Sequence, residues 1–175
     1  MKSKYGVLAG LSACLVLAGC GSGSHQSAAS ASSSAPTTTQ AASVPALGHP
    51  LCVIDTLNGK PIAHDGSDVD LPGGQPFVVT GWLVDSNHHA VDSMQWVLTP
   101  AGGGDARDFS AKTGGLRTDV AEALQTEAAN LAGYTVNGNA DQLAAGPYKA
   151  SAQAESAGKD FQCNFNVTFN VTKAD

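Results

Sequence analysis

The stretch FQCNFNVTFNV, residues 161–171, alternates strictly between apolar and polar side chains. One set of alternate positions holds phenylalanine, valine and Cys163, and the other holds glutamine, asparagine and threonine. Because successive side chains of a β-strand point to opposite faces, this pattern predicts a strand with one buried face and one face in water. Residues 161–171 therefore favour an antiparallel sheet.

Other segments repeat the period of two. Residues 147–155, PYKASAQAE, alternate more weakly and are followed by Ser156-Ala157-Gly158, so they form the first arm of an expected C-terminal β-hairpin. Further strands are expected at residues 51–57, 77–85, 94–99 and 134–137. Residues 118–131 instead carry apolar side chains at helical spacing after Thr118, which can cap a helix. We predict a mainly β fold, an antiparallel immunoglobulin-like β-sandwich with one short helix.

The amino-terminal residues have the character of an export signal. Lys2 and Lys4 precede an apolar run, residues 6–17, that is too short to span a bilayer. The run ends in Leu17-Ala18-Gly19-Cys20, which resembles the lipobox of bacterial lipoproteins. The resemblance implies a signal peptide at residues 1–19, diacylglycerol on the thiol of Cys20 and an acylated mature amino terminus. Two or three acyl chains hold a protein stably on a membrane that it does not span.

The segment after Cys20 changes composition. From Gly21 to Ala46 it is rich in serine, alanine and threonine, and Val44 is its one large apolar residue. Such a segment cannot bury enough surface to offset its ordering entropy. We therefore predict a lipidated, disordered tether at residues 20–46 and a folded domain at residues 47–175.

The cysteines fit an exported domain. Of the four, Cys14 would leave with the signal peptide and Cys20 would carry lipid. Cys52 and Cys163 are left as a pair, and in an oxidising compartment the simplest prediction is one disulfide between the first and last strands.

Five short segments resemble, in order, an immunoglobulin-like accessory module of bacterial envelope proteins. They are IDTLNG (54–59), FVVTGWLVD (77–85), LRTDVAEAL (116–124), AGYTVNG (132–138) and LAAGPYKA (143–150). Thr118 stands where the module has a proline. The resemblance implies a sandwich fold, and it implies no catalytic residues because such modules are appended to larger envelope proteins.

Composition and charge exclude some classes of binding partner. The chain has 175 residues, of which 14% are charged, and a formal net charge of −6. An acidic chain without a basic patch argues against nucleic acid and against anionic lipid as a direct partner. Gly21, rather than aspartate after Cys20, resembles the outer-membrane sorting pattern, so we expect an outer-membrane lipoprotein that faces the periplasm.

Two pairs of residues are candidates for a site. His88 and His89, with Asp85 and Asp92 nearby, have the ligand chemistry of a transition-metal site. Adjacent residues of an extended segment point opposite ways, however, so a polar hairpin loop is the favoured interpretation and no metal or cofactor is expected. Trp82 and Trp96 could stack on sugars.

The tryptophans more simply belong to the core. Met94, Trp96 and Leu98 share one face at a period of two, and a buried tryptophan is common in immunoglobulin-like sandwiches.

The sequence contains no recognisable catalytic motif. Ser156-x-x-Lys159 and Lys112-Thr113-Gly114 resemble fragments of penicillin-interacting serine enzymes, but in reversed order. We interpret the chain as a membrane-anchored envelope lipoprotein, a non-catalytic binding or structural module for an envelope protein or carbohydrate, with contact loops at residues 88–90 and 101–112. Two alternatives remain: a metal-handling lipoprotein that uses the His88/His89 loop, and a small periplasmic hydrolase, which a cleft with converging acid and base residues would favour.

Overall fold

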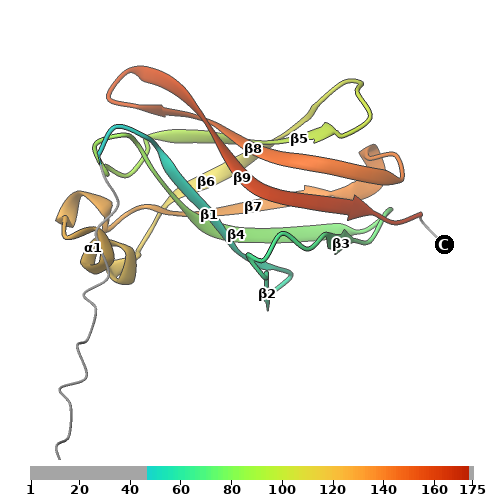
Figure 1. The fold of residues 1–175 in the computed structure, drawn as a ribbon, viewed down its shortest axis with the longest axis horizontal. Coiled ribbons are helices and arrows are strands. Elements are labelled where there is room, and N and C mark those ends of the chain that lie inside the picture. Colours follow the sequence, from blue (N-terminus) through green and yellow to red (C-terminus); the bar gives the residue numbers. More distant parts are fainter. Residues whose placement is uncertain (1–46, 174–175) are drawn as a thin grey trace, which may run out of the picture. The chain divides into compact units, whose positions relative to one another are not determined.

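The alternating stretch around Cys163 forms part of the last strand of a mainly β domain (Figure 1). A computed structural model describes residues 47–173. The expected signal peptide, the lipidated Cys20 and the expected tether up to residue 46 lie outside the described residues.

The described residues form nine strands, one α-helix and two 3₁₀ helices. Their bounds are β1 Leu51–Leu57, β2 Lys60–Pro61, β3 Val69–Leu71, β4 Pro76–Val84, β5 Ser93–Pro100, β6 Arg107–Gly115, α1 Thr118–Leu124, η1 Glu127–Ala129, β7 Gly133–Asn139, η2 Ala140–Gln142, β8 Gly146–Ser156 and β9 Lys159–Val171. Mainly β structure with one short α-helix was predicted, and this is confirmed.

The strands follow the hydrogen-bonded order β2-β1-β4-β7-β6-β5-β8-β9-β3. All neighbours are antiparallel except β3 and β9, which are parallel. The first half of β6, residues 107–110, pairs with β5, whereas the second half, residues 111–115, pairs with β7. The strands thus form one curled sheet whose two halves share β6 (Figure 1). The predicted sandwich would instead have two separate sheets.

The main hydrophobic core draws side chains from both halves of this sheet. At its centre the ring of Trp96 lies within 6 Å, centroid to centroid, of the rings of Phe77, Phe109 and Phe169. Trp96 is fully buried, as expected of a core residue. Aromatic pairs at tilted or edge-to-face angles add to the stabilisation that burial of their area provides.

A disulfide joins the two halves on the side away from β6. Cys52 of β1 and Cys163 of β9 are 111 residues apart in sequence, and their Cα atoms are 6.3 Å apart. The predicted disulfide is confirmed, and it connects two strands that do not pair with each other.

The helical segment between β6 and β7 covers one end of the sheet's outer face. Val120 and Leu124 of α1 pack with Val84 and the half-buried Trp82 in a second, smaller hydrophobic cluster. No helix of residues 47–173 is both long and apolar enough to cross a membrane.

The predicted helix at residues 118–131 is correct only in its first half. Gln125 adopts the left-handed conformation, with φ of 55°, and ends α1. The helix also starts without a side-chain cap, because Arg117 rather than Thr118 holds the N-cap position. Leu131, which was expected on the buried stripe, is 54% exposed.

The expected contact loop at residues 101–112 is wrong in its second half, which belongs to β6. The inward positions of β6 are occupied by Phe109, Ala111 and Thr113, and only the first of these is large and apolar. Because β6 turns the corner between the two halves, it buries little surface, and its hydrophobic pattern is correspondingly faint.

Candidate functional site

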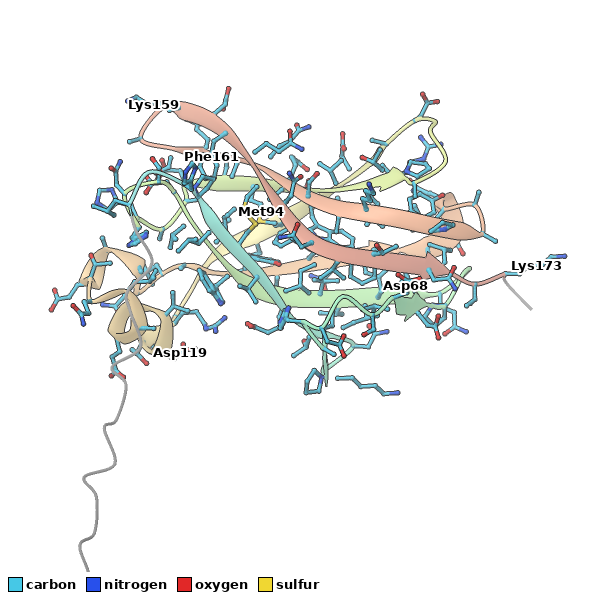
Figure 2. All side chains as sticks on the ribbon, viewed as in Figure 1. Asp68, Met94, Asp119, Lys159, Phe161 and Lys173 are labelled. Atoms are coloured by element: carbon cyan, nitrogen blue, oxygen red, sulfur yellow. A yellow bond between two sulfur atoms is a disulfide. The ribbon has the colours of Figure 1, made fainter. Side chains whose placement is uncertain are left out.

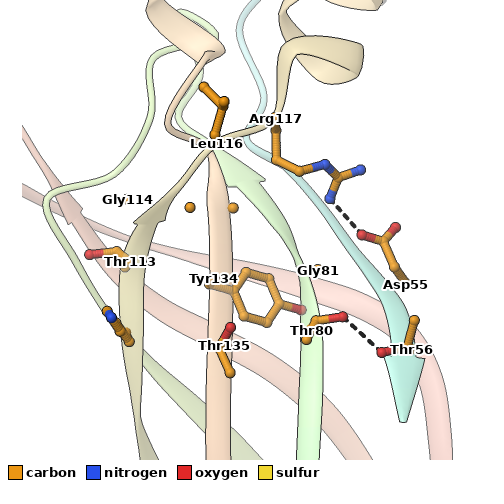
Figure 3. A pocket seen from close by; sticks show the side chains of 13 residues that line it. Asp55, Thr56, Thr80, Gly81, Thr113, Gly114, Leu116, Arg117, Tyr134 and Thr135 are labelled. Atoms are coloured by element: carbon orange, nitrogen blue, oxygen red, sulfur yellow. Dashed lines mark hydrogen bonds and ion pairs between the residues drawn. The ribbon is translucent and has the colours of Figure 1, made fainter. Parts of the chain in front are cut away.

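A groove of about 520 Å³ lies on the outer face of the half formed by β1, β4, β7 and β6 (Figure 3). Its floor is a row of side chains in register across these four strands. Thr56 pairs with Thr80, Thr80 with Thr135, and Thr135 with Lys112. Neighbouring strands lie about 4.8 Å apart, so the row spans roughly 14 Å.

Two β-bulges border the groove. On β1 the register shifts between Ile54 and Thr56, which leaves Asp55 as the extra residue. On β6 it shifts between Thr113 and Gly115, and the extra residue is Gly114, with φ of 86°. Bulges re-aim side chains and occur often beside binding sites. Here the first bulge directs the carboxylate of Asp55 toward the end of the groove.

Arg117 closes that end. Its guanidinium donates one hydrogen bond to Asp55 (Figure 3). It donates two more, from Nε and Nη2, to Asp119 at 2.9 and 2.8 Å. The hydrogen bonds from Arg117 lower the pKa of the Asp119 carboxyl, and those to Asp119 raise the pKa of Arg117. A bidentate pair has fixed geometry as well as energy, so Arg117 forms a rigid wall.

A hydrogen bond and a close approach at Gly81 hold the floor of the groove in place. The hydroxyl of Tyr134 donates to the carbonyl of Val53 at 3.1 Å and passes directly over Gly81. A Cβ on Gly81 would lie 2.1 Å from the Val53 oxygen and 2.6 Å from the Tyr134 hydroxyl, so only glycine fits there. Burial, and then the charge of Asp55, raises the pKa of Tyr134 well above 10.0. The phenol thus remains a neutral hydrogen-bond donor.

The groove offers hydrogen-bonding groups and one free cation. The hydroxyls of Thr56 and Thr80 are 2.8 Å apart and share one hydrogen bond, which leaves each with further capacity. Within residues 47–173 no carboxylate forms an ion pair with Lys112. Leu116, at the rim, is 71% exposed. The groove can therefore hold an extended polar ligand that carries a negative charge near Lys112.

The two histidines have different surroundings. His88 is buried, with φ of 61°, and its Nε2 has no hydrogen-bond partner among the described residues. The side chain of His89 is 56% exposed, and its Nδ1 lies 3.9 Å from a carboxylate oxygen of Asp85. Residues 47–173 contain no group of three or more His, Cys, Asp or Glu side chains that could hold a metal ion.

The two tryptophans differ in exposure. Trp96 lies in the main core, and Trp82 is the half-buried platform beneath α1. A sugar therefore cannot stack on Trp96 in this conformation.

An acid, a serine and a histidine converge near the β4–β5 loop. Ser156 donates its hydroxyl to Asp85 at 2.9 Å, and His89 faces the same carboxylate oxygen. In a serine hydrolase the histidine must accept the serine proton. Here the aspartate accepts that hydrogen bond, which connects Ser156 to the β4–β5 loop.

Sequence reasoning missed most of the groove. Lys112 lay within the expected contact loop. The strand patterns predict only that Thr56, Thr80 and Thr135 face outward, as polar residues of a strand ordinarily do. Two glycines were available as signals. Gly81 interrupts the apolar strand 77–85, and Gly114 lies two residues after Lys112. Glycine inside a strand marks a bulge or a close backbone approach.

Comparisons with known proteins add little. No protein-family model matches the chain, and no curated protein matches it. Among solved structures, the chain is similar to a DUF4785 family protein from Legionella pneumophila subsp. pneumophila str. Philadelphia 1, with 10% identity and a TM-score of 0.32. The match covers 59% of this chain and 27% of that protein, so it spans less than a third of that protein's length.

Proposed function

We propose that this chain is a lipid-anchored bacterial envelope protein whose β-domain binds a partner in the groove of β1, β4, β7 and β6 without catalysing a reaction. The anchor rests on the lipobox-like Leu17-Ala18-Gly19-Cys20, and the tether rests on the composition of residues 20–46. The Cys52–Cys163 disulfide fits an exported domain. The expected site of action is the periplasmic face of the outer membrane.

One observation carries the binding proposal. Two β-bulges flank a row of three threonines and a lysine on a floor that Gly81 and Tyr134 hold in place. Preorganised groups bind more tightly because less freedom is lost when the ligand arrives. The open shape and the hydroxyl lining suit an extended polar segment of an envelope polymer or protein.

We also propose that the domain is a variant of the immunoglobulin-like accessory module. The support is the resemblance of five short segments, the core shared by the two halves and the buried tryptophan at its centre. In this proposal β6 is a strand that pairs with both sheets of the sandwich. Strands that switch sheets are a known way to make a sandwich corner.

Photo-crosslinking in the native envelope tests the groove. A photoreactive amino acid at Lys112 or Thr135 of the full chain should capture a discrete partner. The matched control position is Gln153, which is exposed on the outer face of the other half of the sheet. We expect adducts at both groove positions, and we expect Thr80→Val to reduce the yield several-fold.

Equal adducts at Gln153, or none at the groove, would refute the assignment of the groove. Cys20→Ala tests the anchor separately: unchanged palmitate labelling of that variant would contradict lipidation at Cys20. Turnover of an envelope substrate by the purified chain, lost on Ser156→Ala or His89→Ala, would show that the non-catalytic part of the proposal is wrong.

A further inference from the structure

A second cleft, of about 360 Å³, lies at the end of the domain where the β4–β5 loop meets the β8–β9 hairpin. Figure 2 shows Lys159 and Phe161 in this region, on β9. The cleft is lined by Pro50, Asp85, Ser86, Asn87, His89, Ser156, Ala157, Lys159, Asp160 and Phe161. It shares no lining residue with the groove.

Buried and paired groups fix the two walls of this cleft relative to each other. Asp85 accepts the backbone N–H groups of Asn87 and His89, at 2.8 and 2.9 Å, and the hydroxyl of Ser156 from the opposite wall. Asp92 accepts the backbone N–H of Ala157 at 2.9 Å. The loop and the hairpin are thus connected at both Asp85 and Asp92, which preorganises the space between them.

Each wall contains a residue in an unfavourable backbone conformation. His88 has φ of 61° and Ala157 has φ of 51°, in the left-handed region that glycine adopts without cost. Ala157 and Gly158, with φ of 51° and 72°, are the two central residues of the β8–β9 hairpin, and such two-residue turns require positive φ at both positions. The turn fixes this wall. The cleft is therefore a shaped feature of the fold.

The lining combines an apolar surface with hydrogen-bonding groups around it. Phe161 is half-buried, and Pro50 lies in the same cleft. The side chains of Asn87, Lys159 and Asp160 are exposed, and no carboxylate among the described residues forms an ion pair with Lys159. These residues offer both donors and acceptors to a ligand.

We propose that this cleft binds a single saccharide ring, with the ring's C–H face on Phe161 and its hydroxyls on His89, Asn87 and the residues at the start of β9. A pyranose has an apolar face and a polar edge. These match the apolar surface of the cleft and the hydrogen-bonding groups around it. The volume lies near the lower end of the range of small-ligand sites, which favours one ring over a chain. This site is independent of the groove and would exist whether or not the groove binds a partner.

Titration of the ¹⁵N-labelled full chain, in detergent, with the methyl pyranosides of glucose, galactose and N-acetylglucosamine tests the proposal by NMR. We expect at least one of them to shift the amide signals of residues 86–89 and 156–161 in a saturable way. The affinity expected of one ring is weak, so the titration must reach tens of millimolar. No saturable shift in these segments with any of the three sugars would overturn the proposal, whatever the groove does.

Three variants locate the binding. Phe161→Leu keeps an apolar side chain against the core and removes the ring, and it should weaken binding about tenfold. His89→Ala changes an exposed side chain outside the core and should weaken binding several-fold. Gln162→Ala is the matched control, because Gln162 is exposed and pairs with Gln153 on the opposite face of the sheet. A loss of affinity in Gln162→Ala equal to that in Phe161→Leu would contradict the assignment, as would unchanged affinity in both Phe161→Leu and His89→Ala.

Discussion

The two halves of the sheet are joined in different ways on their two sides. At the corner, β6 runs continuously from one half to the other, with Phe109 among the rings of the central aromatic cluster. At the opposite side, which we call the seam, β1 and β9 share no backbone pairing, and the Cys52–Cys163 disulfide joins them.

This difference separates local from long-range stabilisation. The corner is built from β5, β6 and β7, which are neighbours in both sequence and space. The seam joins residues 111 positions apart, so it must overcome a large loop-closure entropy. A covalent bond removes most of that cost, because it restricts the unfolded chain.

The largest effect is expected at the corner. Trp96→Ala should lower the free energy of unfolding by about 3–5 kcal/mol, because it leaves a cavity among three aromatic rings. Trp82→Ala, at the half-buried platform beneath α1, is the control and should cost less. Urea denaturation measures both, and a larger loss in Trp82→Ala would contradict the central place of Trp96.

The seam should be the next most sensitive. Cys52→Ser and Cys163→Ser should each lower the free energy of unfolding by roughly 2–4 kcal/mol. The double variant should cost no more than either single one, since all three remove the same bond. Costs that add in the double variant would show that each cysteine stabilises the domain by itself.

Hydrogen exchange of the same variants sharpens the comparison. Without the disulfide, amide protection should fall more in β1 than in β6, because the lost bond holds β1 directly, whereas β6 stays paired along its length, first with β5 and then with β7. Equal loss in the two strands would mean that the corner and the seam open as one unit.

Acid should weaken the contact between the β4–β5 loop and the β8–β9 hairpin, which also connects the two halves. Burial by itself would raise the pKa of Asp85, but the hydrogen bonds from His89, Asn87 and Ser156 outweigh it and lower the pKa below the ordinary 3.8. A carboxyl with a depressed folded-state pKa stabilises the fold above its unfolded pKa and loses that contribution as the pH falls through the folded value. The contribution of Asp85 should therefore begin to decline below about pH 4 and be lost once the pH falls below the folded-state pKa.

Asp85→Asn should lower stability at neutral pH by roughly 1–3 kcal/mol and flatten the decline in acid. Thermal denaturation across pH 2–7, an interval that brackets the carboxyl titration, compares the variant with the parent. A parallel pH profile in the variant would show that other carboxyls cause the acid response.

The smallest effect is expected from the ion pair at the groove. Asp55→Asn weakens the contact between Arg117 and β1, within one half of the sheet, and it should cost less than about 1 kcal/mol because the pair is partly exposed. The same variant should still change the yield of photo-crosslinked partner at position 112, since Asp55 and Arg117 form the end wall of the groove. A cost as large as that of breaking the disulfide would mean that this pair belongs to the framework of the fold.

Sequence alone was sufficient where a local rule determines the outcome. The alternation in residues 161–171 predicted β9, and Ser156-Ala157-Gly158 predicted the hairpin with β8. The number of cysteines left in the exported domain predicted the disulfide. The interior place of Trp96 followed from a period of two. Each of these depends on neighbours in the chain or on a count of reactive groups.

Tertiary structure alone decided the rest. The row of Thr56, Thr80, Thr135 and Lys112 exists only because four strands from distant parts of the chain pair in one register, and no local pattern encodes that register. The cleft at Phe161 likewise depends on two turns that Asp85 connects across 71 positions of sequence. Even β6 was hidden, because a strand that turns a corner buries too little apolar surface to leave a clear periodicity.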